Sequence, residues 1–469
     1  MQRPLAAALA TLLVCTTAHA QSATPVPRVL MVDNCNDSGT GSLRNVVLTA
    51  DDGDTVDLSN LSCSVISLST GAIVIGAHDL TLHGPGKDAL KITSAGNPGS
   101  GVLYAIEPGT LKIDGVTLSS GSKYATTGTA HGGCIFSTGS LQISDSRIDG
   151  CSVLGTNTAD ALGGAVYAGG DVTLIRSVVE LSGATSNAGT ARGGGVFAGG
   201  GLTIAYSTIS DCRVSTTQQG YGGGAFVGEN VVAKYSTIRD NTVDDSPVSN
   251  GGGLISHGNA VVLFSTISGN HARIGGGLYF GAGVDGDVAT VVNSTISGNT
   301  ATAAGGARSR LPLSLANSTI AFNTIPRPYS GVLDYSESAG LGVLAAPVSL
   351  NSSIIANNIA EGTNSVPRDV GGRLQMTITG SNNLIGNVGQ GAPAGTLTAD
   401  PLLGPLRNNG GLTATHALRP GSPAIDAGNN IRNFNVDQRG EGFARVLGSQ
   451  PDIGAYEVDP DRIFDDGFD

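Results

Sequence analysis

A unit of about thirty residues recurs through the middle of this chain and restricts its fold more than any other feature. Each unit contains a Gly pair, a short apolar run, a second apolar run, and then Ser-x-Ile or Ser-x-Val. The serines of that last element are mostly 29 to 31 residues apart: Ser146, Ser177, Ser207, Ser236, Ser265, Ser294, Ser318 and Ser352. Repetition at this period is typical of a solenoid, in which each unit packs on its neighbours.

The composition of each unit predicts strands rather than helices. Apolar and polar residues alternate, as in Leu202 and Ile204 or Val172 and Leu174, which is the period of a strand with one buried face. The apolar residues are largely β-branched, and Gly and Asn interrupt every unit before an amphipathic helix could form. We therefore expect an all-β fold, a single right-handed parallel β-helix of about eleven rungs.

Stacked rungs place equivalent residues of successive units in ladders, which can be aligned from the sequence. One aliphatic ladder is predicted inside the helix: Ile148, Val179, Ile209, Ile238, Ile267, Ile296, Ile320 and Ile354. The residues before the repeat serines predict an ion pair, an aromatic stack and an amide ladder: Asp145, Arg176, Tyr206, Tyr235, Phe264, Asn293, Asn317 and Asn351. A second amide row is expected at tight left-handed turns: Asn241, Asn270, Asn299, Asn323 and Asn357.

The segments that flank the repeats predict the domain organisation. A basic residue, an apolar run and Ala-His-Ala make residues 1–20 a predicted secretory signal peptide. Residues 28–60 are expected to form an N-terminal cap with a helix behind Ser42, followed by the β-helix over 61–395. Residues 396–458 are expected to form a C-terminal cap and 459–469 a tail. Prolines and lost periodicity predict loops over 326–348 and 360–372.

The charge balance excludes some classes of partner. The chain has 37 acidic and 25 basic residues, for a net charge of −12. An acidic surface argues against nucleic acid and anionic membranes. After the signal, no apolar run reaches the ~20 residues of a transmembrane helix, so we expect an exported, soluble bacterial protein.

Five cysteines remain after the predicted signal, an odd number for an exported protein. Cys35 and Cys63 flank the cap and are expected to form one disulfide. Cys151 and Cys212 occupy one ladder position with Ser182 between them, and two rungs span ~9.6 Å, too far for a bridge. We therefore predict a Cys134–Cys151 disulfide and leave the state of Cys212, free or paired between chains, open.

Two C-terminal blocks carry a resemblance to a known group of proteins. The blocks GSPAIDAG (421–428) and DIGAYE (452–457) resemble the terminal module of secreted bacterial proteins of the choice-of-anchor Q type. The front segment, Cys35 followed by GSLRNVV, resembles the cap of the same families, with Asn45 where their pattern has Glu. The repeats are similar to those of polymorphic outer-membrane proteins. This resemblance implies an architecture and no particular chemistry.

Candidate catalytic groups are few. Asp149 and Glu180 are expected one rung apart on one ladder, and Asp211 and Asp240 one rung apart on the neighbouring ladder. Paired carboxylates could bind a cation or share acid–base catalysis. The competing interpretation is a solvated wall with interspersed arginines. Loop residues Asp244 and Asp245, with His257 one repeat on, resemble elements of polygalacturonase-like enzymes, although the Arg-x-Lys of that family is absent. No metal-ligand spacing is found, and we predict neither a metal nor a cofactor.

Two classes of function follow. The favoured hypothesis is a non-catalytic surface or extracellular module, adhesin-like or a matrix scaffold, whose partner is a glycan or a cell-surface or matrix component. The alternative is a carbohydrate-active enzyme, a polysaccharide lyase or glycoside hydrolase using Asp244, Asp245 and His257 on the outer wall. The sequence does not decide whether the aromatic residues project from the wall to meet a ligand.

Overall fold

The computed structural model describes residues 26–460, apart from 95–98, 282, 327–337, 345–346, 362–365, 368, 373–377 and 388–390. The predicted signal peptide at 1–20 and residues 461–469 of the expected tail lie outside the described residues. So does most of the loop expected at 326–348, and part of the loop expected at 360–372.

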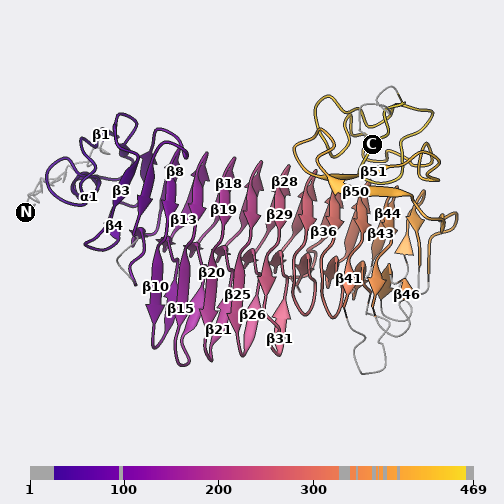
Figure 1. The fold of residues 1–469 in the computed structure, drawn as a ribbon, viewed down its shortest axis with the longest axis horizontal. Helices are drawn as coiled ribbons and strands as arrows, with labels where there is room; N and C mark the ends of the chain where they lie inside the picture. Colours follow the sequence, from indigo (N-terminus) through magenta and orange to yellow (C-terminus); the bar gives the residue numbers. More distant parts are fainter. Residues whose placement is uncertain are drawn as a thin grey trace, which may run out of the picture.

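Three long parallel sheets form the wall of a β-helix (Figure 1). The first has thirteen strands, from β1 (Val29–Met31) to β48 (Ile378–Thr379), and the second has twelve, from β3 (Val65–Ser67) to β49 (Leu384–Ile385). The third has eleven, from β4 (Ile73–Ile75) to β47 (Val370–Gly372). Neighbouring strands of each sheet come from successive repeats, which confirms the predicted parallel β-helix of about eleven rungs.

The predicted aliphatic ladder occupies the interior, with one correction at its end. From Ile148 through Ile320 its members pair in register along the twelve-stranded sheet and are almost fully buried. The next member is Ile355 and not the predicted Ile354, because Ile320 pairs with Ile355 between β40 (Thr319–Ala321) and β44 (Ile354–Ala356). A slip of one residue reverses which side chains face inward, so Ile354 faces the opposite side of the sheet.

The same slip shifts three polar ladders in the last rungs. The turn ladder of residues before the repeat serines continues from Asn317 to Ser352, which has positive φ, rather than to the predicted Asn351. The serine ladder continues to Ser353 rather than Ser352, since the Ser353 hydroxyl accepts the Ser318 N–H at 3.3 Å. The amide row continues to Asn358 rather than Asn357 and ends on the Asp369 carboxylate. Of the predicted members only Asn357 has the expected left-handed backbone. Elsewhere the expectation was wrong, because it is the residue before each amide that has positive φ, which turns the amide inward to bond the next rung.

Two short sheets extend the solenoid on one side, which the sequence analysis did not anticipate. One runs from β10 (Ser122–Ala125) to β30 (Thr242–Val243) and the other from β11 (Thr129–His131) to β31 (Val248–Asn250), five strands each (Figure 1). They enclose a small core of their own, built mainly from alanine and valine: Ala130, Val153, Ala161, Ala184, Ala191, Val214, Val243 and Ala272. We call this part the side extension.

The N-terminal end is covered by the predicted helix. The helix α1 (Leu43–Val47) begins behind Ser42, whose hydroxyl accepts the Asn45 N–H. Leu43, Val46 and Val47 are buried against β2 (Thr55–Asp57) and β4. Besides this helix, the cap region contributes two strands, β1 and β2, to the thirteen-stranded sheet.

The segment expected as a C-terminal cap lies against the side of the solenoid (Figure 1). It contains the antiparallel pair β50 (Leu403–Arg407) and β51 (Thr415–Leu418). Its apolar residues pack on the outer face of the twelve-stranded sheet, where Ile354 and Leu384 lie, and its backbone and amides bond the sheet's threonines. The contacts between this segment and the sheet run along several rungs of the wall. We therefore call residues 403–458 the side module.

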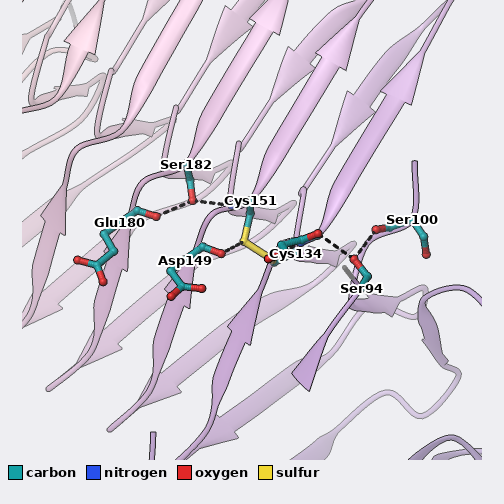
Figure 2. Close-up of a disulfide and its surroundings, with 9 residues drawn as sticks. Ser94, Ser100, Cys134, Asp149, Cys151, Glu180 and Ser182 are labelled. Carbon is teal, nitrogen blue, oxygen red and sulfur yellow. Dashed lines mark hydrogen bonds between the residues drawn. A yellow bond between two sulfur atoms is a disulfide. The ribbon is translucent and has the colours of Figure 1, made fainter. Parts of the chain in front are cut away.

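Two disulfides join the expected cysteines. Cys35 pairs with Cys63 across the cap, with Cα atoms 6.4 Å apart, and Cys134 pairs with Cys151 at 5.5 Å. Figure 2 shows the second bridge, where the Ser182 hydroxyl of the next rung accepts the Cys151 N–H and donates to the Glu180 carbonyl. Cys212 is free and buried, which resolves its state within the chain.

Candidate functional site

Five aromatic rings stack along the outer face of the eleven-stranded sheet, and we call this set the ring ladder. Its members stand on β7 (Leu103–Ala105), β12 (Ile135–Ser137), β17 (Val166–Ala168), β22 (Val196–Ala198) and β27 (Ala225–Val227): Tyr104, Phe136, Tyr167, Phe197 and Phe226. Neighbouring centroids lie 4.4 to 5.3 Å apart with interplanar angles of 5 to 15°. Each ring is the middle residue of its strand, so the flanking residues fill the core.

Basic side chains flank the ring ladder on the side of the extension. The Lys123 ammonium lies 5.4 Å from the Tyr104 centroid, and the Arg192 guanidinium lies 5.4 Å from that of Phe226. His131 meets Tyr167 edge to face at 4.6 Å. Burial lowers the pKa of His131, which keeps its imidazole neutral near pH 7.

The stacking decides which part of each ring a ligand could meet. Aromatic rings carry negative potential on their faces and positive potential at their edges. In the ring ladder the faces are directed at neighbouring rings, so a ligand could meet only edges. Phe136 and Phe197 are buried, and the half-buried rings of Tyr104, Tyr167 and Phe226 leave their edges for the surface. Together with Lys123 and Arg192, these edges form a positive stripe on an acidic protein. Such a stripe suits the oxygen-rich and anionic groups of an extended chain that lies along the helix axis.

A second aromatic stack lies at the turn that the sequence analysis singled out. Tyr206, Tyr235 and Phe264 stack at 5.2 and 4.7 Å, at residues with positive φ. Phe264 is buried against Phe434 of the side module, whereas Tyr206 is 48% exposed. This stack contributes to docking of the side module at one end. The Asp145–Arg176 ion pair expected at the same turn position is also present, at 2.6 Å.

The paired carboxylates proposed from the sequence occur in register but are matched by arginines. Asp149 on β14 (Arg147–Asp149) pairs with Glu180 on β19 (Val178–Glu180), and Arg147 forms an ion pair with Glu180. Burial raises the pKa of Asp149.

The second carboxylate pair is bridged by a single arginine. The Arg239 guanidinium lies 3.6 Å from Asp211 and 2.7 Å from Asp240. Both carboxylate pairs therefore include an ion pair with an arginine on the outer wall, and neither is arranged as the acid and base of a catalytic site.

The loop candidates have different partners. Asp244 pairs with Arg213 at 2.7 Å on the side extension, and Asp245 lies 3.6 Å from His271. His257 instead packs on Phe226 of the ring ladder, with centroids 5.3 Å apart. Its Nδ1 lies 3.3 Å from the Val227 carbonyl oxygen. These contacts tie His257 to the ring ladder and the two aspartates to the edge of the extension.

In the part of the chain that the structure describes, no group of three or more His, Cys, Asp or Glu side chains is arranged to hold a metal ion. No helix among these residues has the length and apolar character needed to cross a membrane.

Comparison with known proteins yields one structural relative. No family model matches the chain, and no curated protein matches it. The crystal structure of pectate lyase Pel9A aligns with 93% of this chain and 97% of its own, at 12% identity and a TM-score of 0.41. A likeness at this level bears on neither substrate nor activity.

The ring ladder was missed by the sequence analysis although it has a sequence signal. From Phe136 to Phe226 the aromatic residue follows the first glycine of its Gly pair by four positions, and the steps are 31, 30 and 29 residues. The pattern was hidden because each strand is only three residues long, so the outward position is a single residue among apolar neighbours.

Proposed function

We propose that this protein is an exported, non-catalytic β-helix module that binds a glycan chain along the ring ladder at a bacterial surface or in its matrix. The observation that carries this proposal is the continuous stack of rings with cations at its flank. The half-buried rings Tyr104, Tyr167 and Phe226 stand on alternate rungs of a ladder with ~4.8 Å per rung, and this regular spacing along the axis matches a polymer rather than a small molecule.

Acidic glycans are the favoured ligand class. The ring edges, Lys123 and Arg192 present positive potential, which attracts carboxylate or sulfate groups. The chain as a whole has a net charge of −12, which repels the same polymer and favours binding at the stripe. Two disulfides support an oxidising, extracellular location, together with the predicted signal at 1–20.

The C-terminal blocks support placing the chain among choice-of-anchor Q-type secreted proteins. Ala424 of GSPAIDAG and Ile453 of DIGAYE are both buried in the interface between side module and solenoid. The resemblance therefore involves residues that build the module rather than exposed linkers. Its implication for function is attachment or display at the cell surface, again without a particular chemistry.

A glycan-binding array with matched variants tests the proposal. We expect binding to acidic glycans, weakened about tenfold in Tyr167→Ala and in Arg192→Ala, which each remove one contact of the stripe. Tyr206→Ala is the matched control, because it removes an exposed ring of the other stack and should bind like the wild type. Binding should also weaken as salt rises. Equal loss in all three variants, or no binding to any glycan, would contradict the proposal.

The enzymatic alternative is tested in the same preparation. Degradation of pectin, polygalacturonate or alginate, with or without calcium, is not expected. Chain cleavage abolished by Asp244→Ala, Asp245→Ala or His257→Ala would replace the binding proposal with a polysaccharide lyase or hydrolase. His257→Ala is the most informative of the three variants, because its ring contacts Phe226 and the variant should weaken binding in the non-catalytic case.

A further inference from the structure

A serine and a histidine from distant parts of the chain meet where the side module lies on the solenoid. Ser297 ends β37 (Thr295–Ser297) in the twelve-stranded sheet, and His416 is on β51. The Ser297 Oγ is 2.8 Å from His416 Nε2, and His416 Nδ1 is 2.7 Å from the Gly404 carbonyl oxygen. Both residues are almost fully buried, at 2% and 3% exposure.

The hydrogen-bond partners determine the protonation of the imidazole. A carbonyl oxygen can only accept, so Nδ1 carries the proton and donates to Gly404. Nε2 is then unprotonated and accepts the hydroxyl proton of Ser297. A serine bonded to a base that a third group holds in orientation is the arrangement of an activated nucleophile. Burial also lowers the pKa of His416, which keeps the imidazole in its basic form at neutral pH.

A cavity of about 420 Å³ opens beside this pair. It is lined by Ser297 and His416, by the apolar residues Phe322, Pro405 and Leu406, and on the solenoid side by Asp240 and Ser268. Gly298, the residue after the serine, also lines the cavity and has positive φ. Its N–H makes only a long bond of 3.4 Å to the Ala321 carbonyl. To stabilise an oxyanion, as the N–H directly after a nucleophile can, this N–H would have to exchange the Ala321 carbonyl oxygen for the substrate oxygen.

The geometry points to a second activity at this interface: Ser297 and His416 form a nucleophile and base that hydrolyse esters of short acyl groups. This site is separate from the ring ladder and does not rest on the proposed glycan binding. Esters are favoured over amides because a neutral carbonyl, rather than a carboxylate, orients His416. The imidazolium is then less stabilised, and an alkoxide needs less assistance to leave than an amine.

The reaction balances with water as the only co-reactant. Ser297 Oγ attacks the ester carbonyl carbon while its proton passes to His416 Nε2. The ester C–O bond then breaks, and the leaving alkoxide takes that proton, so an alcohol departs and an acyl-serine remains. Water gives a proton to Nε2 and attacks the acyl-serine, which releases the carboxylic acid and restores the Ser297 hydroxyl.

A phosphonate probe and a chromogenic ester test this activity. We expect the full-length protein to be labelled on Ser297 by a fluorophosphonate and to hydrolyse 4-nitrophenyl acetate. Ser297→Ala should abolish labelling and lower hydrolysis by ~10²-fold or more, as should His416→Gln. Ser268→Ala is the matched control, because Ser268 pairs with Ser297 one rung away and lines the same cavity without bonding His416.

Folding is checked independently of activity. Ser297→Ala keeps the volume of the side chain nearly unchanged, and the next residue on that ladder is already Ala321. Resistance of the side module to limited proteolysis should therefore match the wild type. An unlabelled wild-type protein, or labelling and hydrolysis that persist in Ser297→Ala, would overturn the assignment and leave the Ser297–His416 bond as a docking contact.

Discussion

Buried amides hold successive rungs together one residue at a time. In the row from Asn241 to Asn358, each interior Oδ1 accepts both the backbone N–H and the Nδ2–H of the preceding asparagine, and each Nδ2 also donates to a buried carbonyl. Asp369 ends the row with a carboxylate that accepts both donors of Asn358. Burial raises the pKa of Asp369. Since unpaired buried groups are costly, every member of the row depends on its neighbours.

Asn270→Ala should destabilise the middle rungs. The change leaves the Asn241 backbone N–H without its acceptor, and leaves the Ile238 carbonyl and Asn299 Oδ1 each short of one donor. We expect a loss of ~3 kcal/mol in the free energy of unfolding, from the urea midpoint. Amide exchange at Asn241 should quicken as well. Asn230→Ala is the control, because Asn230 accepts the same two kinds of bond from Asn259 on the exposed surface, and a midpoint equal to that control would show that burial of the row contributes little.

At the scale of elements, the strands are too short to be stable alone and depend on what covers the ends of the sheets. The N-terminal edge is closed by α1 and by two ionic contacts, Arg44–Asp37 and Arg28–Asp54, of which only the Asp54 carboxylate is fully buried. Asp37 accepts bonds from Arg44, Ser69 and Thr70, which hold its pKa well below its usual range despite partial burial. Asp54 accepts three bonds from Arg28 and one from the Asp51 N–H.

The N-terminal cap should loosen in acid, and Asp54 should be one cause. The hydrogen bonds from Arg28 lower the pKa of Asp54 to about 2, so its contribution to stability is present above its ordinary pKa near 4. That contribution is lost as the pH falls from about 4 through about 2. We expect Asp54→Asn to lower stability at pH 6 and to flatten the dependence on pH between 4 and 2. Asp51→Asn, an exposed partner of the same arginine, should keep the wild-type slope.

At the scale of the whole molecule, the side module makes the last rungs part of a two-layered structure. Gln438 lies at the centre of the contact: its Oε1 accepts from Thr295 at 2.6 Å, and its Nε2 donates to Thr266 and Thr413. Around it, the module buries the outward aliphatic side chains of the twelve-stranded sheet. The same contact creates the cavity beside Ser297.

Gln438→Ala should release the side module before the solenoid unfolds. The substitution leaves buried hydroxyl groups unpaired and a cavity behind, at a cost of about 2 to 4 kcal/mol to docking. Limited proteolysis should cleave within 403–458 faster than in the wild type, while the far-UV circular dichroism of the β-helix stays unchanged. Gln450→Ala is the exposed control. Cleavage at the wild-type rate would indicate that the apolar contacts alone hold the module.

The repeat pattern was sufficient to predict the solenoid, most of its interior ladders and the Cys134–Cys151 disulfide, because a regular period places equivalent residues next to each other without knowledge of distant contacts. The pattern became ambiguous where identical residues stand in pairs. Ser352 and Ser353, Ile354 and Ile355, and Asn357 and Asn358 each allow two registers, and local periodicity cannot choose between them. Side-chain packing determines the register: Ile355 fills the core of the solenoid, whereas Ile354 packs against the side module.

The candidate sites depended on the tertiary structure to a greater degree. The position of an aromatic residue four places after the first glycine of its Gly pair was a sequence signal for the ring ladder. Only the stacking geometry showed that the rings present their edges, and not their faces, to a ligand. Ser297 and His416 are separated by 119 residues, and nothing local relates them. The repeats determined the architecture of this protein, because the contacts that they encode are made between neighbouring units of the sequence. Docking of a non-repetitive segment on the wall was decided by the folded surface, since its contacts exist only once both parts have formed.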